Sequence, residues 1–116
     1  MAVVVLDAGH GGSDLGATYQ GRQEKDDTLA LTLAVGRLLA EDPDIDVVYT
    51  RETDVYDTPL VKARKANAAN ADYFVSIHRK FNFVINILTK ILQFHFLNNH
   101  ILFLLTFLMY DPLLTV

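Results

Sequence analysis

Two histidines and one glutamate are the residues of this sequence whose types and spacing could do chemistry together. His10 follows an apolar run at the start of the chain, and His78 follows a second apolar run at residues 73–77. Glu24 lies between them, at the end of a glycine-rich stretch. Two imidazoles and one carboxylate are a common catalytic zinc set that leaves a fourth position for water. Bound zinc lowers the pKa of that water to about 7, so the set favours a hydrolytic metal site.

The same residues have other interpretations, and their spacing alone does not decide among them. The segment Asp7-Ala8-Gly9-His10-Gly11-Gly12 could be a phosphate-binding loop, because glycine-rich turns between a strand and a helix expose backbone N–H groups. It matches neither G-x-G-x-x-G nor G-x-x-x-x-G-K-S/T. Glu24 could merely complement the positive end of a helix dipole. A metal hydrolase and a phosphate-binding protein therefore both remain open at this point.

An alternation of strands and helices must position these residues. Apolar, β-branched runs predict strands at residues 2–6, 46–50 and 73–77. The spacing of apolar residues predicts a helix from residue 26 or 27 to about residue 40, and Pro59 predicts the start of a second helix over residues 60–69. This βαβαβ order over residues 2–78 predicts an α/β fold with a mainly parallel sheet and flanking helices. Ligands of such sheets collect beyond the carboxyl ends of the strands, where His10, Glu24 and His78 would meet if the first and third strands are neighbours.

The composition narrows the function classes. The chain has 116 residues, about one domain, and 51% hydrophobic residues, enough for a buried core. Its formal net charge of −4 argues against nucleic-acid binding, which usually needs a basic surface. Cysteine is absent, which excludes disulfides, thiolate zinc sites and cysteine nucleophiles. The first apolar run is short and no basic segment precedes it, so we expect no secretory signal peptide.

The chain divides into two segments of unlike composition, which we expect to be residues 1–80 and 81–116. All 6 glycines lie in the first segment, whereas the only charged residues of the second are Lys90 and Asp111. Partial helical spacing of Phe83, Ile87 and Ile91 predicts that this apolar tail is helical or poorly ordered, and its apolar surface predicts poor solubility. The apolar stretch 101–109 is shorter than the roughly 20 residues of a membrane-spanning helix, so we expect no span.

Several motifs of the first segment carry a resemblance to a known family. They occur in order at residues 4–12 (VVLDAGHGG), 24–26 (EKD), 50–54 (TRETD) and 71–78 (ADYFVSIH). Together they resemble the zinc-dependent N-acetylmuramoyl-L-alanine amidases of the Amidase_3 type, which include cell-wall autolysins and phage endolysins. The resemblance covers residues 3–79, about two thirds of the chain, and ends where the composition changes.

The resemblance implies a metal, a reaction and a substrate. It implies that His10, Glu24 and His78 hold Zn²⁺, and that activated water cleaves the amide between N-acetylmuramoyl and L-alanine in peptidoglycan. It also implies action in the cell wall, in the extracellular or periplasmic space. The family's late catalytic glutamate has no counterpart, because residues 81–116 contain no glutamate. Such a hydrolase needs a carboxylate to carry a proton from water to the leaving amine. We therefore leave the catalytic residue unassigned and expect impaired turnover, or else a non-catalytic, zinc-containing remnant that binds the cell wall.

Three further polar residues are candidates for supporting roles. Asp7 could orient a ligand imidazole from outside the metal's own shell, although a cap on the following loop is the favoured interpretation. Arg51 and Asp54 follow the second strand and could contact a glycan or a peptide carboxylate. A structural salt bridge to the second helix, for example through Arg64, is the alternative that we favour for them.

The abrupt change after residue 79 suggests a hypothesis about the encoding DNA. The tail lacks alanine and glycine, whose codons begin with GC and GG, and is rich in phenylalanine, isoleucine, leucine and asparagine. An adenine- and thymine-rich stretch translated in a wrong frame would give this composition. We therefore expect the family domain to be truncated or frameshifted here, and translation of the other frames tests the hypothesis.

Overall fold

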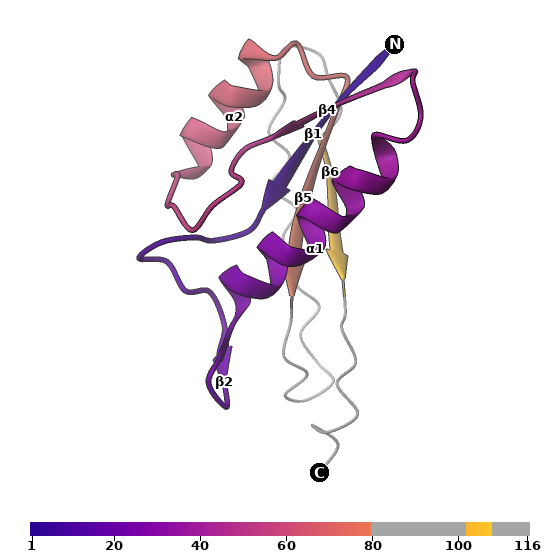
Figure 1. The fold of residues 1–116 in the computed structure, drawn as a ribbon. Coiled ribbons are helices and arrows are strands. Elements are labelled where there is room, and N and C mark those ends of the chain that lie inside the picture. Colours follow the sequence, from indigo (N-terminus) through magenta and orange to yellow (C-terminus); the bar gives the residue numbers. More distant parts are fainter. Residues whose placement is uncertain (80–101, 108–116) are drawn as a thin grey trace.

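Four parallel strands form the sheet that carries the candidate residues. The computed structural model describes residues 1–79 and 102–107. In these residues the strand order is β4-β1-β5-β6 (Figure 1), with bounds β1 (Ala2–Ala8), β4 (Ile45–Tyr49), β5 (Tyr73–Arg79) and β6 (Leu102–Phe107). The first and third predicted strands, β1 and β5, are direct neighbours, with Asp7 opposite Ser76 and Ala8 opposite Ile77. The predicted α/β class with a mainly parallel sheet is confirmed.

Two helices, α1 (Glu24–Leu39) and α2 (Pro59–Ala68), cover opposite faces of this sheet. On one face Val5 of β1 forms a buried cluster with Ala66 of α2. Successive side chains of a strand point to opposite faces, so Tyr49, which pairs with the residue after Val5, points the other way. Its hydroxyl lies against Gly36 of α1 and leaves no room there for a side chain. Strand β1, which is buried from Val4 to Ala8, is therefore covered on both faces, as its continuous apolar run predicts.

The two helices differ in how clearly the sequence marks their starts. The side chain of Thr58 accepts a hydrogen bond from the backbone N–H of Val61, and Pro59 occupies the first turn, so α2 has both of its usual start signals. Helix α1 begins at Glu24, two or three residues earlier than predicted, after the extended residue Gln23 and without a side-chain cap. Acidic residues in its first turn complement the helix dipole. Glu24 is thus the first residue of the helix rather than the last residue of the loop.

The ends of two strands and the long loop before α1 differ from the prediction. Strand β1 continues through Asp7 to Ala8, and β5 continues through His78 to Arg79, because the ladder between β1 and β5 and the ladder between β5 and β6 extend that far. The long loop before α1 contains a small antiparallel hairpin of β2 (Thr18–Tyr19) and β3 (Arg22–Gln23). The hairpin turns at Gly21, whose φ is +78°.

One stretch of the tail differs from the prediction of a helix. Leu102–Phe107 forms β6, which pairs in parallel with β5 from Phe74 to Arg79. Strand β6 therefore covers the edge of β5 that a sheet ending at residue 79 would leave unpaired. The helical spacing at Phe83, Ile87 and Ile91 lies outside the described residues, as does the greater part of the segment 81–116. Within the described ranges, no helix has the length and apolar character needed to cross a membrane.

Candidate metal centre

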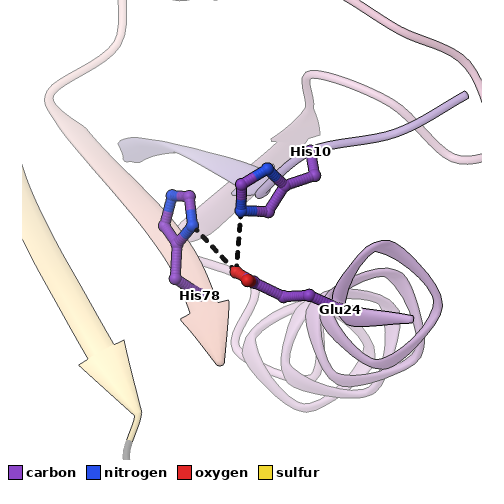
Figure 2. Close-up of side chains that lie close together, drawn as sticks. All are labelled: His10, Glu24 and His78. Carbon is purple, nitrogen blue, oxygen red and sulfur yellow. Dashed lines mark hydrogen bonds and ion pairs between the residues drawn. The ribbon is translucent and has the colours of Figure 1, made fainter. Parts of the chain in front are cut away.

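The three predicted ligand residues converge at the carboxyl end of the sheet (Figure 2). His10 comes from the loop after β1, His78 from the end of β5 and Glu24 from the start of α1. Glu24 Oε2 lies 2.8 Å from His10 Nε2 and 3.2 Å from His78 Nδ1. One potential ligand atom of each residue lies within 4.8 Å of the other two. The imidazole rings stand edge to face, with centroids 5.1 Å apart.

The glycines around His10 make this convergence possible. The backbone turns sharply at His10, whose φ is +65°, and continues through Gly11 and Gly12 with positive φ. Gly9 lies against the ring of His78, and Gly16 lies against both His10 and Glu24. A Cβ atom at Gly9 or Gly16 would come closer than 3.0 Å to these side chains. The glycine-rich composition of the loop thus serves the close approach of the three residues.

Asp14 fixes the outer nitrogen of His10. Its Oδ2 lies 2.9 Å from His10 Nδ1, and its Oδ1 accepts a hydrogen bond from the backbone N–H of Gly16. An ionised carboxylate only accepts hydrogen bonds, so the proton of this contact belongs to Nδ1. When the ring is neutral, its inner nitrogen Nε2 then presents a lone pair to the carboxylate of Glu24. A lone pair 2.8 Å from a carboxylate oxygen is unfavourable, so this contact favours either a proton on Nε2 or a metal ion that binds both groups.

Glu24 is held as an anion in a buried position. Its Oε1 accepts from the N–H of Ala17 and its Oε2 accepts from the N–H of Arg79. Burial alone would raise the pKa of Glu24, but its contacts with His10 and His78 and the hydrogen bond from the N–H of Ala17 outweigh it and leave the pKa well below its usual range. The same contact with Glu24 raises the pKa of His10, although burial and Asp14 also act on it. The metal-free site therefore favours a proton shared between an imidazole and this carboxylate.

The donor set and its surroundings fit a divalent metal ion. Nitrogen and carboxylate ligands in a two-histidine, one-carboxylate set suit zinc and leave one position open. Metal-binding histidines usually give their second ring nitrogen to a carboxylate, carbonyl or hydroxyl, which fixes the ring. Here Asp14 contacts the second nitrogen of His10, and Ser76 Oγ lies 3.1 Å from Nε2 of His78.

The glycine-rich loop uses its own backbone donors, which disfavours the phosphate-binding alternative. The N–H groups of Gly9 and Gly11 donate to backbone carbonyls, of Ile77 and Asp14 respectively. The N–H of Gly12 donates to Asp54 at 2.7 Å. A phosphate-binding loop instead keeps such groups available for its ligand.

Asp7 contacts side chains rather than loop amides. It lies in β1 with 3% exposure, and its carboxylate accepts from Thr50 Oγ1 at 2.7 Å and from Ser76 Oγ at 2.6 Å. The ammonium of Lys62, from α2, lies 3.0 Å from Oδ1. The favoured interpretation of Asp7 as a loop cap is therefore replaced by a buried position beneath His78.

Arg51 and Asp54 tie the glycine-rich loop to α1 rather than to α2. The buried guanidinium of Arg51 donates to the carbonyl oxygens of Ala8, Gly9 and Lys25. Asp54 pairs with Lys25 Nζ at 2.7 Å. The favoured interpretation, a salt bridge to the second helix, is therefore wrong: Arg51 hydrogen-bonds the end of β1 and the start of α1, and Asp54 forms its ion pair with α1. These contacts hold the segments of His10 and Glu24 together.

Comparison with known proteins identifies the family. A family model described as N-acetylmuramoyl-L-alanine amidase, of the Amidase_3 type, matches residues 4–82. The chain belongs to this family. Among relatives in the family, the endolysin of Bacillus phage SPP1 is 47% identical over 76 residues, which are 66% of this chain and 28% of that protein. The N-acetylmuramoyl-L-alanine amidase CwlM of Bacillus licheniformis is 42% identical over 79 residues, 67% of this chain and 31% of that protein.

Solved structures of the family share the fold of the first segment. The catalytic domain of CwlV, an amidase from Bacillus (Paenibacillus) polymyxa var. colistinus, superimposes with a TM-score of 0.67 at 39% identity, covering 69% of this chain and 46% of that one. An amidase from Clostridium difficile 630 gives a TM-score of 0.67 at 35% identity, covering 72% of this chain and 47% of that one. The chain thus spans about a third or less of the curated relatives named above and about half of these structures.

The sequence analysis did not predict the residues that contact the second ring nitrogens of His10 and His78. Asp14 lies four residues after His10, but this spacing has meaning only in a helix, and the segment is a turn. Ser76 lies two residues before His78 in a strand, so the period of two could have placed both on one face. Lys62 gives no signal, because its contact with Asp7 depends on how α2 packs on the sheet.

Proposed function

We propose that this chain binds one Zn²⁺ ion through His10, Glu24 and His78 and acts on the amide between N-acetylmuramoyl and L-alanine of peptidoglycan. The observation that carries the proposal is the contact of both imidazoles with the same buried carboxylate, that of Glu24, in a chain of the amidase family. Its partner would be the stem peptide and glycan of the cell wall, met in the extracellular or periplasmic space where the family acts.

Each of the three residues would supply one ligand atom to the ion. Glu24 supplies a negative ligand whose two oxygens also accept hydrogen bonds from the N–H groups of Ala17 and Arg79. His10 supplies Nε2, with its other nitrogen held by Asp14, and His78 supplies Nδ1. When bound, zinc contributes Lewis-acid chemistry, which lowers the pKa of water and polarises a substrate carbonyl.

We infer that turnover by this chain is weak. Cleavage of an amide needs a group that takes a proton from water and gives it to the leaving amine. The carboxylate of Asp14 is engaged by His10, and that of Glu24 is a proposed ligand. The chain has no glutamate beyond Glu52, so the late glutamate of the family has no candidate here. This favours a second candidate function, a zinc-containing protein that binds the cell wall without cleaving it.

Metal analysis and product analysis of the full chain test these proposals. We expect about one zinc per chain, and its loss in His10→Ala and His78→Ala. A chain that folds but binds no zinc would overturn the proposed site. Free L-alanine amino groups released from purified peptidoglycan should appear far more slowly than with the CwlV catalytic domain. Sedimentation with peptidoglycan without release supports the binding function, whereas release at the CwlV rate contradicts the inferred weak turnover.

A further inference from the structure

A line of buried hydrogen bonds leads away from the candidate metal centre through the sheet. Nε2 of His78 lies 3.1 Å from Ser76 Oγ, which lies 2.6 Å from Oδ2 of Asp7. Ser76 is 5% exposed and Asp7 is 3% exposed. Neither residue belongs to the proposed ligand set. Buried polar side chains in the strands of a largely apolar sheet are unusual and call for a structural or functional explanation.

The sheet register builds this line from rigid elements. Ser76 and His78 are two residues apart in β5, so both point to the same face. Asp7 lies directly opposite Ser76 in the parallel pairing of β1 with β5. The position of the line therefore depends on backbone pairing and not on a mobile loop.

The proton of each hydrogen bond follows from the nature of the groups. The carboxylate oxygens of Asp7 accept from Thr50 Oγ1 and Ser76 Oγ and lie 3.0 Å from Lys62 Nζ, so all of these contacts use Asp7 as the acceptor. Ser76 has a single hydroxyl proton, and the short contact with Asp7 uses it. The oxygen of Ser76 can then only accept from His78, so Nε2 of His78 carries a proton. The lone pair of a neutral His78 is left on Nδ1, which faces Glu24 at 3.2 Å.

We propose that Asp7 and Ser76 are positioning residues that hold His78 in the Nε2–H tautomer and aim Nδ1 at the metal. The proposal rests on the proposed function, since it concerns a ligand of the same site. Histidine ligands need one specified nitrogen free of a proton, and outer partners of this kind typically contribute 10- to 100-fold to metal affinity. Asp7 thus acts on His78, through Ser76, and not on the nearer residue in sequence, His10.

A purely structural role for this line gives different expectations. If Asp7 only balanced the charge of Lys62, and Ser76 only filled space, loss of the Ser76 hydroxyl would lower stability without changing the tautomer of His78. Thr32 supplies a matched control for such general effects. Its buried hydroxyl in α1 has no hydrogen-bond partner among the described residues, so Thr32→Val removes a buried hydroxyl away from the line.

Zinc affinity and the tautomer of His78 test the proposal together. In the full chain, competition with a chromophoric chelator should show zinc binding weakened about 10-fold or more in Ser76→Ala. Ser76→Thr, which keeps the hydroxyl, and Thr32→Val should have a zinc affinity close to that of the chain without substitutions. In the metal-free chain, side-chain ¹⁵N spectra of neutral His78 should show Nε2–H, and Ser76→Ala should shift the proton to Nδ1, which then donates to Glu24.

The two readouts separate failure of the proposal from failure of the metal site. Unchanged zinc affinity in Ser76→Ala, or an Nδ1–H tautomer in the unchanged metal-free chain, would overturn the positioning role. If the unchanged chain binds no zinc, the proposed function fails, whereas the ¹⁵N spectra of the metal-free chain still decide the role of Asp7 and Ser76.

Discussion

Substitution of Gly16 by alanine should disturb the candidate metal centre although it replaces none of the proposed ligands. A Cβ at Gly16 would lie 2.6 Å from Cδ2 of His10 and 2.8 Å from Cβ of Glu24. Ordinary contact begins at 3.4 Å, so the neighbours would have to move by about 0.6 to 0.8 Å. Metal sites hold ligand distances to within about 0.2 Å. We therefore expect zinc affinity to fall at least about tenfold, which corresponds to about 1.4 kcal/mol.

Gly21→Ala is the matched control for Gly16→Ala. Both glycines have positive φ, +66° at Gly16 and +78° at Gly21, so alanine at either position carries a left-handed backbone cost of roughly 1–2 kcal/mol. A Cβ at Gly21, however, has no atom within 4 Å. Urea denaturation should show the backbone cost in both variants and a further loss of stability in Gly16→Ala from its contacts with His10 and Glu24, and chelator competition should show a loss of zinc affinity in Gly16→Ala alone. Equal zinc affinity in the two variants would refute the argument that Gly16 sets the spacing of the ligands.

Three other predictions follow from contacts around the site. Asp14→Asn should weaken zinc binding about tenfold in the same competition assay, because Nδ1 of His10 loses its charged acceptor. Unchanged affinity would show that Asp14 does not orient the ring. Thermal unfolding of the metal-free chain should show the largest contribution of the site between about pH 4.5 and pH 6.5. The lowered pKa of Glu24 gives stability that is lost as pH falls below its usual 4.5, and the raised pKa of His10 gives stability that is lost as pH rises above its usual 6.5. A flat pH profile would contradict this pairing. Asp7→Asn should lower the free energy of unfolding by about 3–5 kcal/mol in urea denaturation, because it leaves the largely buried ammonium of Lys62 without its carboxylate. Adding Lys62→Met should recover part of this loss, and no recovery would contradict a stabilising role of the ion pair.

The sequence predicts the layout of the fold because strand and helix patterns are local. Continuous apolar runs mark strands buried on both faces, and Pro59 marks the start of α2. Parallel order then brings the ends of β1 and β5 to one edge, which places His10 near His78. The start of α1 was harder to predict, because Glu24 begins the helix without a capping side chain.

The polar partners of the site could not be predicted in the same way. Whether Asp7 lies opposite Ser76 depends on the register between two strands separated by 65 residues or more, and the sequence of each strand is compatible with several registers. The contact between Asp14 and His10 depends on the positive φ of His10, which residue types alone do not indicate. The strand β6 was missed because a short, nearly continuous apolar run has no periodicity that distinguishes a strand from a helix.

The hydrogen bonds of the two imidazoles show why this site is prepared for a cation before one binds. Each ring has its outer nitrogen on a fixed polar group, Asp14 for His10 and Ser76 for His78, and turns its inner nitrogen toward the same oxygen of Glu24. Neutral rings in this arrangement would bring two lone pairs against a negative charge, which is unfavourable in a largely buried place. A proton relieves one such contact, whereas a divalent ion relieves both at once. Zinc and protons therefore compete for the same position, and zinc affinity should decrease as pH falls.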